Sequence, residues 1–390
     1  MKVSYTVTKI SCYIGYFIQA IVNNLLPILF IALQNVYGLS YEELARIILV
    51  NFTVQMITDL NTPLIIKLMG YKKGVTMANI AATAGLVMLS VLPVVMKNSY
   101  AAILISVVVM AFGSGLIEVV ISPMVEMLPT KNKAGNMAVL HSFYCWGQAV
   151  TVVATTLLVL AFGYKGWTFI PLIWAIVPFF NLFFFLPCPI VEPNETVKQD
   201  SLKTLIKSRK FRCYLIMMLC GGAAEIAMAQ WASMFAQQSL GVSKAIGDLT
   251  GPCAFAILMG MGRILYAVFS KQVNFKKLLT VLGIMCFVCY AVVAVCNVPL
   301  IALVFCALCG LTVSVFWPGI YSAGAADFPL GGAVMFSAFA MFGDTGCSAG
   351  PWVIGLVADK MGLSTGILSA SVFPLLLVVT TVILIKIKDR

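Results

Sequence analysis

The segment from Leu278 to Ala326 contains no charged residue, and it constrains the fold of this chain more than any other feature. A helix needs about 20 apolar residues to cross a bilayer, so the segment is long enough for two crossings. The turn between them falls at Asn297-Val298-Pro299. Soluble domains average about 25% charged residues, whereas this chain has 10% and is 61% hydrophobic. The sequence therefore predicts an integral membrane protein.

Apolar segments of similar length recur along the whole chain. Backbone polar groups have no water partners in hydrocarbon, so each such segment is expected to be a helix. The first apolar run, 10–33, is longer than the apolar region of a cleavable signal peptide, so it is read as the first span. We predict twelve transmembrane helices, at about 9–33, 44–68, 75–96, 100–125, 136–162, 167–187, 211–238, 248–270, 278–296, 299–323, 333–357 and 364–386.

The basic residues lie mainly on one side of this arrangement. If the N-terminus is inside, 19 of the 25 Lys and Arg residues fall on the cytoplasmic side and 5 outside, with Arg263 within a span. Cytoplasmic loops of membrane proteins carry this excess, which predicts that both termini are cytoplasmic. The net charge of +11 then reflects orientation in a lipid bilayer and not nucleic-acid binding. We expect a multi-pass, monomeric protein of the plasma membrane, the inner membrane in a bacterium.

A polar loop divides the chain near its middle. It predicts an N-terminal half (1–189), a cytoplasmic linker loop (190–210) and a C-terminal half (211–390), with six spans in each half. A weak internal repeat supports this division, because 113–123 and 135–147 can be laid on 310–318 and 331–343. Two parallel six-helix halves are the plan of the major facilitator fold, whose substrate site lies between the halves. The predicted fold class is thus an all-α membrane protein with two pseudo-symmetric halves.

Ionisable residues within the spans are costly in a bilayer, so each calls for a partner or a function. Glu118 lies in a glycine-rich segment that ends at Pro123, and we expect it to face an aqueous cavity, bind hydroxyl groups and take up a proton. For the others two hypotheses stay open. Arg263 could pair with Asp344 or with the pseudo-equivalent Asp59 as a structural or gating contact, with His141 as a further partner of Asp59. Alternatively, Asp59 or Asp344 could carry coupling protons.

Amide and indole side chains complete the predicted substrate site. Sugar rings stack their C–H faces on aromatic side chains while their hydroxyl groups bond to amides and carboxylates. The predicted substrate-binding residues are Asn23, Asn24, Glu118, His141, Gln148, Glu225, Gln230, Trp231 and Trp317. The twelve cysteines are expected to pack as small side chains between helices. The sequence predicts no metal site and no cofactor.

Several motifs resemble those of one transporter family. Gly113-x-Gly-x-x-Glu118-x-x-x-x-Pro123, the Asn23-Asn24-Leu25 segment and the basic Gly70-Tyr-Lys-Lys-Gly74 loop are similar to the fucose/proton symporter family of the major facilitator superfamily. The resemblance covers the N-terminal half and, more loosely, 343–359. It implies proton-driven sugar import, with Glu118 at the family's essential glutamate of span four.

The chain departs from that family at Pro27. The family's fucose carrier has an aspartate shortly after the paired asparagines, whereas this chain has a proline. Proton coupling is therefore expected at Glu118, Asp59 or Glu225, or else the chain is an uncoupled sugar uniporter.

Two alternatives to a sugar transporter, an enzyme and a drug transporter, are judged by different features of the sequence. An enzyme is not expected, because the chain has no H-E-x-x-H motif and only one histidine. The main rival within the superfamily is a multidrug or organic-anion transporter. A cavity lined by Met and Phe would favour that rival, and a cavity lined by Asn, Gln, Glu and Trp would favour a sugar.

Overall fold

The computed structural model describes residues 5–39, 41–130, 132–190, 200–270 and 272–387, and every regular element in these ranges is helical. The elements before the linker loop are α1 (Thr6–Tyr37), α2 (Tyr41–Val95), α3 (Ser99–Met127), α4 (Lys133–Phe162), the 3₁₀ turn η1 (Tyr164–Gly166) and α5 (Phe169–Phe185). The elements after it are α6 (Leu202–Lys207), α7 (Arg209–Gln238), α8 (Lys244–Asp248), the π-helical η2 (Leu249–Cys253), α9 (Ala254–Phe269), α10 (Phe275–Val295), α11 (Pro299–Val313), α12 (Phe316–Asp327), α13 (Gly332–Met361), α14 (Leu363–Ala370) and α15 (Val372–Lys386).

Element α2 contains two spans joined at a single glycine. Gly70 has φ 75° and ψ 169°, a conformation that glycine adopts without a Cβ clash. The chain is helical again from Tyr71, so the basic loop expected at 70–74 is shorter than the sequence suggested.

Each of three other spans consists of two or three short helical segments that follow one another through the bundle. Pro252 lies in η2, between α8 and α9, and its missing N–H leaves a gap in the regular helical ladder. Short breaks also separate α11 from α12 and α14 from α15. Ten segments of the described chain are long and apolar enough to cross a membrane, and one of them is the double span of α2. With α13, which is 30 residues long but carries Asp344, the described chain has the twelve predicted spans.

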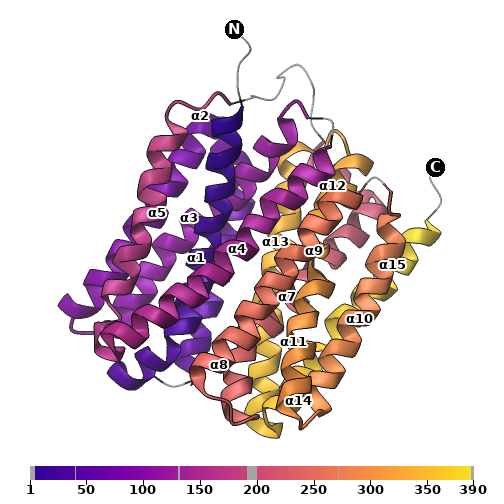
Figure 1. Ribbon diagram of the computed structural model, residues 1–390. Helices are drawn as coiled ribbons and strands as arrows, with labels where there is room; N and C mark the ends of the chain where they lie inside the picture. The colour runs from indigo at the N-terminus through magenta and orange to yellow at the C-terminus, as the bar shows by residue number, and fades with distance from the viewer. Residues whose placement is uncertain (1–4, 40, 131, 191–199, 271, 388–390) are drawn as a thin grey trace.

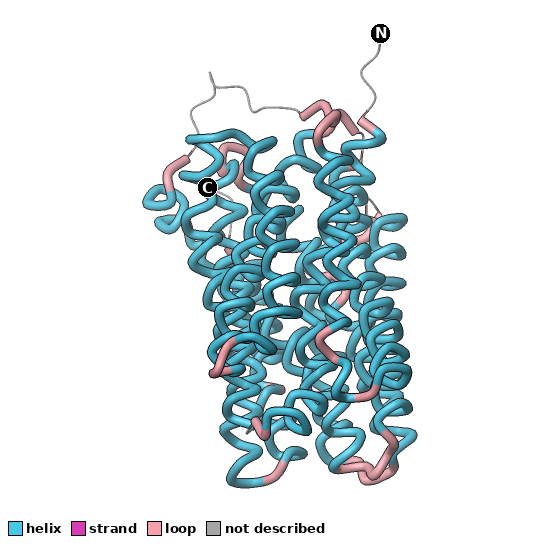
Figure 2. The backbone as a smooth tube through the Cα atoms, turned by 90° about the vertical axis from the view of Figure 1, so that its left-hand side faces the viewer, coloured by secondary structure: helices cyan, strands magenta, loops and turns pink. Residues whose placement is uncertain are grey.

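The spans run side by side as one helical bundle (Figure 1). The first six spans, indigo to magenta, lie on one side, and the last six, orange to yellow, lie on the other. α1 begins and α15 ends at the same end of the bundle, which is also visible in Figure 2. We call this the terminal end and the opposite one the far end. The charge distribution predicts that the terminal end is cytoplasmic.

The outer surface of the bundle is apolar. On α5, Phe180 and Phe183 are 57% and 51% exposed, and on α4 Leu160 is 69% exposed. Apolar side chains exposed over so wide an area would be unfavourable in water but are solvated by lipid tails.

Glycines let the helices approach closely. A Cβ at Gly113 would lie 2.6 Å from the backbone nitrogen of Ala82, so no larger residue fits between α3 and the second span of α2. Gly346 of α13 is tighter still, because its Cβ would lie 1.9 Å from the carbonyl oxygen of Leu219 on α7.

The two sets of six spans contact each other through α4 with α9 and α2 with α13. At the terminal end, Asn132 Nδ2 donates to the carbonyl oxygen of Ala267 at 3.3 Å. Toward the far end, Thr156 Oγ1 donates to Asp248 Oδ2 at 3.3 Å. The two halves are therefore in contact near both ends of the bundle on the side where α4 lies.

The cysteines include two C-x-x-C pairs that face each other. Cys286 and Cys289 lie on α10, and Cys306 and Cys309 lie on α11. The sulfur atoms of Cys286 and Cys309 are 3.8 Å apart, so they are in contact without being bonded. In the described chain, no three His, Cys, Asp or Glu side chains are grouped so that they could hold a metal ion.

Candidate substrate-binding site

A small cavity lies between the two sets of six spans. α1 to α4 line it from the first half and α7, α9, α12 and α13 from the second. The lining residues are Tyr16, Gln19, Asn23, Phe52, Glu118, His141, Tyr144, Glu225, Ile226, Arg263, Trp317, Asp344 and Cys347.

Asn23 is the centre of an amide network on one wall of the cavity. Its Oδ1 accepts hydrogen bonds from Asn51 Nδ2 at 3.1 Å and from Gln55 Nε2 at 2.9 Å. Gln55 is held in turn by Ser114, whose hydroxyl donates to its Oε1 at 3.2 Å. With both acceptor positions of the Asn23 oxygen filled, the orientation of the amide is fixed.

Glu118 lies in the cavity wall on α3 and is 3% exposed. The Nε2 group of Gln19, on α1, donates a hydrogen bond to Glu118 Oε2. Tyr321, from α12 of the other half, also interacts with this carboxyl group. In the described chain Glu118 forms no ion pair, so its negative charge is balanced only by neutral donors.

An aromatic and hydroxyl cluster lies beside Glu118. The hydroxyl of Tyr16 is 2.6 Å from Ser122 Oγ and 3.5 Å from His141 Nε2. The ring centroids of Tyr16 and His141 are 4.8 Å apart in an edge-to-face arrangement. His141 thus packs between α1 and α12, where Tyr321 lies 5.7 Å away.

Arg263 forms a buried ion pair with Glu225, which differs from both predicted pairings. Its Nη2 lies 3.0 Å from Glu225 Oε2, and the two side chains are 2% and 4% exposed. Its Nη1 donates to the carbonyl oxygen of His141 at 2.7 Å, and its Nε donates to the carbonyl oxygen of Ser314 at 3.1 Å. The expected pairing of Arg263 with Asp344 or Asp59 is therefore wrong for this conformation.

The two aspartates instead lie against each other. Asp59, on α2, and Asp344, on α13, are 0% and 2% exposed, and their side chains meet where the two halves touch. Asp344 lines the cavity, whereas Asp59 lies behind it. The suggested contact of Asp59 with His141 is thus replaced by a contact with another acid.

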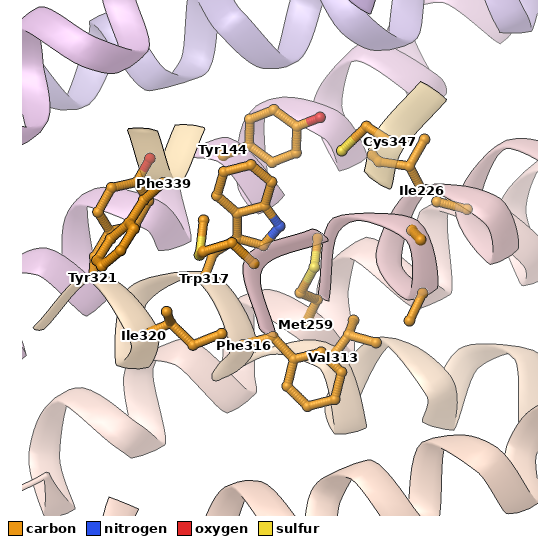
Figure 3. Close-up of a cluster of buried hydrophobic side chains, with 14 of the residues drawn as sticks. Tyr144, Ile226, Met259, Val313, Phe316, Trp317, Ile320, Tyr321, Phe339 and Cys347 are labelled. Carbon is orange, nitrogen blue, oxygen red and sulfur yellow. The ribbon is translucent and has the colours of Figure 1, made fainter. Parts of the chain in front are cut away.

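Trp317 gives the cavity a flat aromatic face. Its ring stacks on Tyr321 with a centroid distance of 6.1 Å and an angle of 29°. Figure 3 shows Trp317 beside Tyr144, with Tyr321 and Phe339 to one side. Gly343 leaves room for the indole, because a Cβ there would lie 2.3 Å from the Trp317 ring.

Four predicted substrate-binding residues lie outside this cavity. Asn24 is turned toward its own helix, where its Nδ2 donates to the carbonyl oxygen of Ala20 at 2.9 Å. The Trp231 indole donates to the carbonyl oxygen of Pro351 at 3.1 Å. Gln148 is buried, and Gln230 lines a smaller adjacent pocket with Asn23 and Asn51.

Several lining residues were missed by the sequence reasoning. Tyr16, Gln19 and Asn23 follow each other at intervals of three and four along α1, which places them on one helix face. That periodicity could have identified Gln19 and Tyr16, since they lie one and two helical turns before Asn23 on the same face. Phe52 and Tyr144 carried no comparable signal, because aromatic residues are common throughout the spans.

A family comparison assigns the chain to a class of transporters. Residues 12–351 match the family described as the Major Facilitator Superfamily, and the chain belongs to that family. It is accordingly a secondary transporter of small molecules and not an enzyme. No curated protein matches the sequence.

Solved structures with this fold include sugar:proton symporters. The chain is 17% identical to a variant of the Escherichia coli fucose:proton symporter, with a TM-score of 0.78 over 99% of this chain and 100% of that one. It is 13% identical to a D-xylose-proton symporter, with a TM-score of 0.79 over 99% and 98% of the two chains. A proton:xylose symporter bound to 6-bromo-6-deoxy-D-glucose is 10% identical, with a TM-score of 0.81 over 96% and 94%. At these identities the likeness establishes the fold alone.

Proposed function

We propose that this protein carries a small polar solute, a sugar, across the membrane by alternating access together with protons. The cavity lining supports this proposal most directly. It offers the amides of Gln19 and Asn23, the carboxyl groups of Glu118 and Asp344, and the face of Trp317 to one small space. Hydroxyl groups pair with the first four side chains, and the apolar face of a pyranose packs on the fifth.

The residues that line the cavity also favour a sugar over a drug as the solute. Among its described lining residues there is no methionine, and Phe52 is the only phenylalanine. Promiscuous sites use flexible methionine-rich surfaces that repack around different apolar ligands. The lining of this cavity is instead held by hydrogen bonds, as at Asn23.

Glu118 is the proposed proton carrier. A buried carboxylate without a cation is costly, so protonation relieves the cost of closing the cavity around it. Gln19 keeps a hydrogen bond to this carboxyl group, which holds it in place in either protonation state. Pro27 occupies the α1 position at which the resemblance would place an acid, and it lines the smaller pocket, so α1 does not supply the carboxyl group there.

Binding and coupling are tested on the purified protein in separate experiments. Thermal stability is measured with monosaccharides, lipophilic cations and organic anions, and a selective shift with a monosaccharide is expected. The same sugar is then supplied to proteoliposomes with and without an inward proton gradient. Accumulation that requires the gradient supports symport. Equilibration that ignores the gradient would identify a uniporter, and a shift only with lipophilic cations or organic anions would overturn the sugar assignment.

A further inference from the structure

The buried aspartate pair includes one acid, Asp59, that does not line the cavity, and substrate binding leaves its position unexplained. Asp59 lies one helical turn beyond Gln55 along α2, toward the terminal end of the bundle. It faces Asp344 from the other half, and Asp344 in turn lines the cavity. Next to it, the hydroxyl of Ser337 donates to the carbonyl oxygen of Asp59, which holds α2 against α13.

In the described chain no cation forms an ion pair with either acid, and three of the four carboxyl oxygens lack a hydrogen-bond donor. Within the described chain, both carboxyl oxygens of Asp59 and Oδ2 of Asp344 receive no hydrogen bond from another group. The titratable groups that face the pair are Glu118 on α3, Tyr321 on α12 and Cys347 on α13. The nearby Arg263 is engaged with Glu225. A negative charge on either aspartate therefore lies close to other acidic groups and is not neutralised by a cation.

Two ionised carboxylates cannot satisfy each other. Both are acceptors only, and at contact distance in a dry interface their repulsion is strong. One proton changes this, because a protonated carboxyl donates to its ionised neighbour and a charge-assisted hydrogen bond forms.

We propose that Asp59 and Asp344 share one proton, and that this proton holds the two halves together at the terminal end of the cavity. When the halves separate there, the O–H···O⁻ bond between the acids breaks and both carboxyl groups meet water. The shared proton then passes to water on that side, leaving two solvated carboxylates. The closed state at the terminal end is thus favoured at low pH and lost as pH rises. This inference deepens the proposed function by adding a second proton site, but its test needs no sugar.

The test uses a single reporter thiol at the closing contact. Ala267 is 8% exposed and lies against Asn132 across the halves, so Ala267→Cys becomes reactive when the terminal end opens. Maleimide labelling is measured in detergent at pH 5 and pH 8, and each rate is divided by that of the unfolded protein at the same pH. The protein without the reporter corrects for the native thiols, of which Cys296 alone is more than slightly exposed.

Labelling is expected to be several-fold faster at pH 8 than at pH 5. Asp344→Asn should give slow labelling at both pH values, because the amide donates to Asp59 without a titrating proton. Asp344→Ala should give fast labelling at both. Asp327→Asn, which changes an exposed acid elsewhere at the terminal end, should behave like the parent protein.

Two results, one for the parent protein and one for Asp344→Asn, would overturn the shared proton. One is a parent protein whose labelling is the same at both pH values. The other is an Asp344→Asn variant, monodisperse on gel filtration, that keeps the full pH response. Glu118→Gln separates this inference from the proposed function, since the pH response of labelling should survive in that variant; its loss there would assign the response to Glu118 and overturn the pair.

Discussion

Arg263 pairs with Glu225 at 3.0 Å inside the second half of the chain, while the same guanidinium bonds to the main chain of the first half at His141. The pair lies in the cavity wall. A single side chain therefore combines an ion pair within one half with a contact between the halves.

Removing one member of this ion pair is expected to destabilise the fold more than removing both. An unpaired buried charge costs about 3–5 kcal/mol. Glu225→Ala or Arg263→Ala alone should therefore lower the melting temperature strongly, and the double variant should recover part of the loss. The pair of Lys133 with Glu126, at 3.6 Å, is the control, because Lys133 is 55% exposed and ion pairs that reach water contribute about 0–1 kcal/mol. Strict additivity of Glu225→Ala and Arg263→Ala in the melting temperature would contradict the coupling.

Glu118→Gln is expected to abolish gradient-driven accumulation while leaving the protein folded and able to bind solute. Glutamine keeps an oxygen for the bond from Gln19 but cannot exchange a proton. The measurement is uptake into proteoliposomes with an imposed proton gradient, alongside binding by thermal shift. Glu126→Gln, on the same helix but outside the cavity lining, serves as the matched control and should accumulate normally. Wild-type accumulation by Glu118→Gln would remove the proposed role.

Asn23→Ala is expected to weaken solute binding about 5–30-fold, because it removes a cavity-lining amide whose hydrogen bond to a solute hydroxyl contributes about 1–2 kcal/mol. Equilibrium binding measures the effect. Asn61→Ala is the control, because Asn61 is exposed and its Nδ2 bonds to the carbonyl oxygen of Ile57 in its own helix. Equal affinity for Asn23→Ala and the parent protein would place the solute elsewhere.

Reporter fusions test the orientation of the bundle. Fusions after Lys73, Lys207 and Lys277 should report the cytoplasm, and fusions near Lys97 and Lys244 should report the outside. The physical reason is the 19 to 5 distribution of basic residues. A fusion within 190–210 that reports the outside would contradict both the orientation and the predicted position of the linker loop.

The spans could be predicted because each depends on one property, a sufficient length of apolar sequence. The ion pair could not, because Glu225 and Arg263 lie on different spans and meet through the rotation of α7 and α9. The pseudo-repeat suggested Asp59, in the opposite half, as a partner of Arg263. It gave no information on the direction in which either side chain points. The Asp59–Asp344 contact was missed for a related reason: sequence reasoning seeks opposite charges, and two acids meet only where a proton or a cation intervenes.

The bond from Arg263 to His141 ends on a backbone oxygen, and no substitution at position 141 removes that atom. The imidazole beside it lines the cavity and is free to be replaced without breaking the connection. Descendants of this chain could therefore exchange the side chain that meets the solute and acquire a new preference, while the Arg263 contact between the two halves is inherited unchanged.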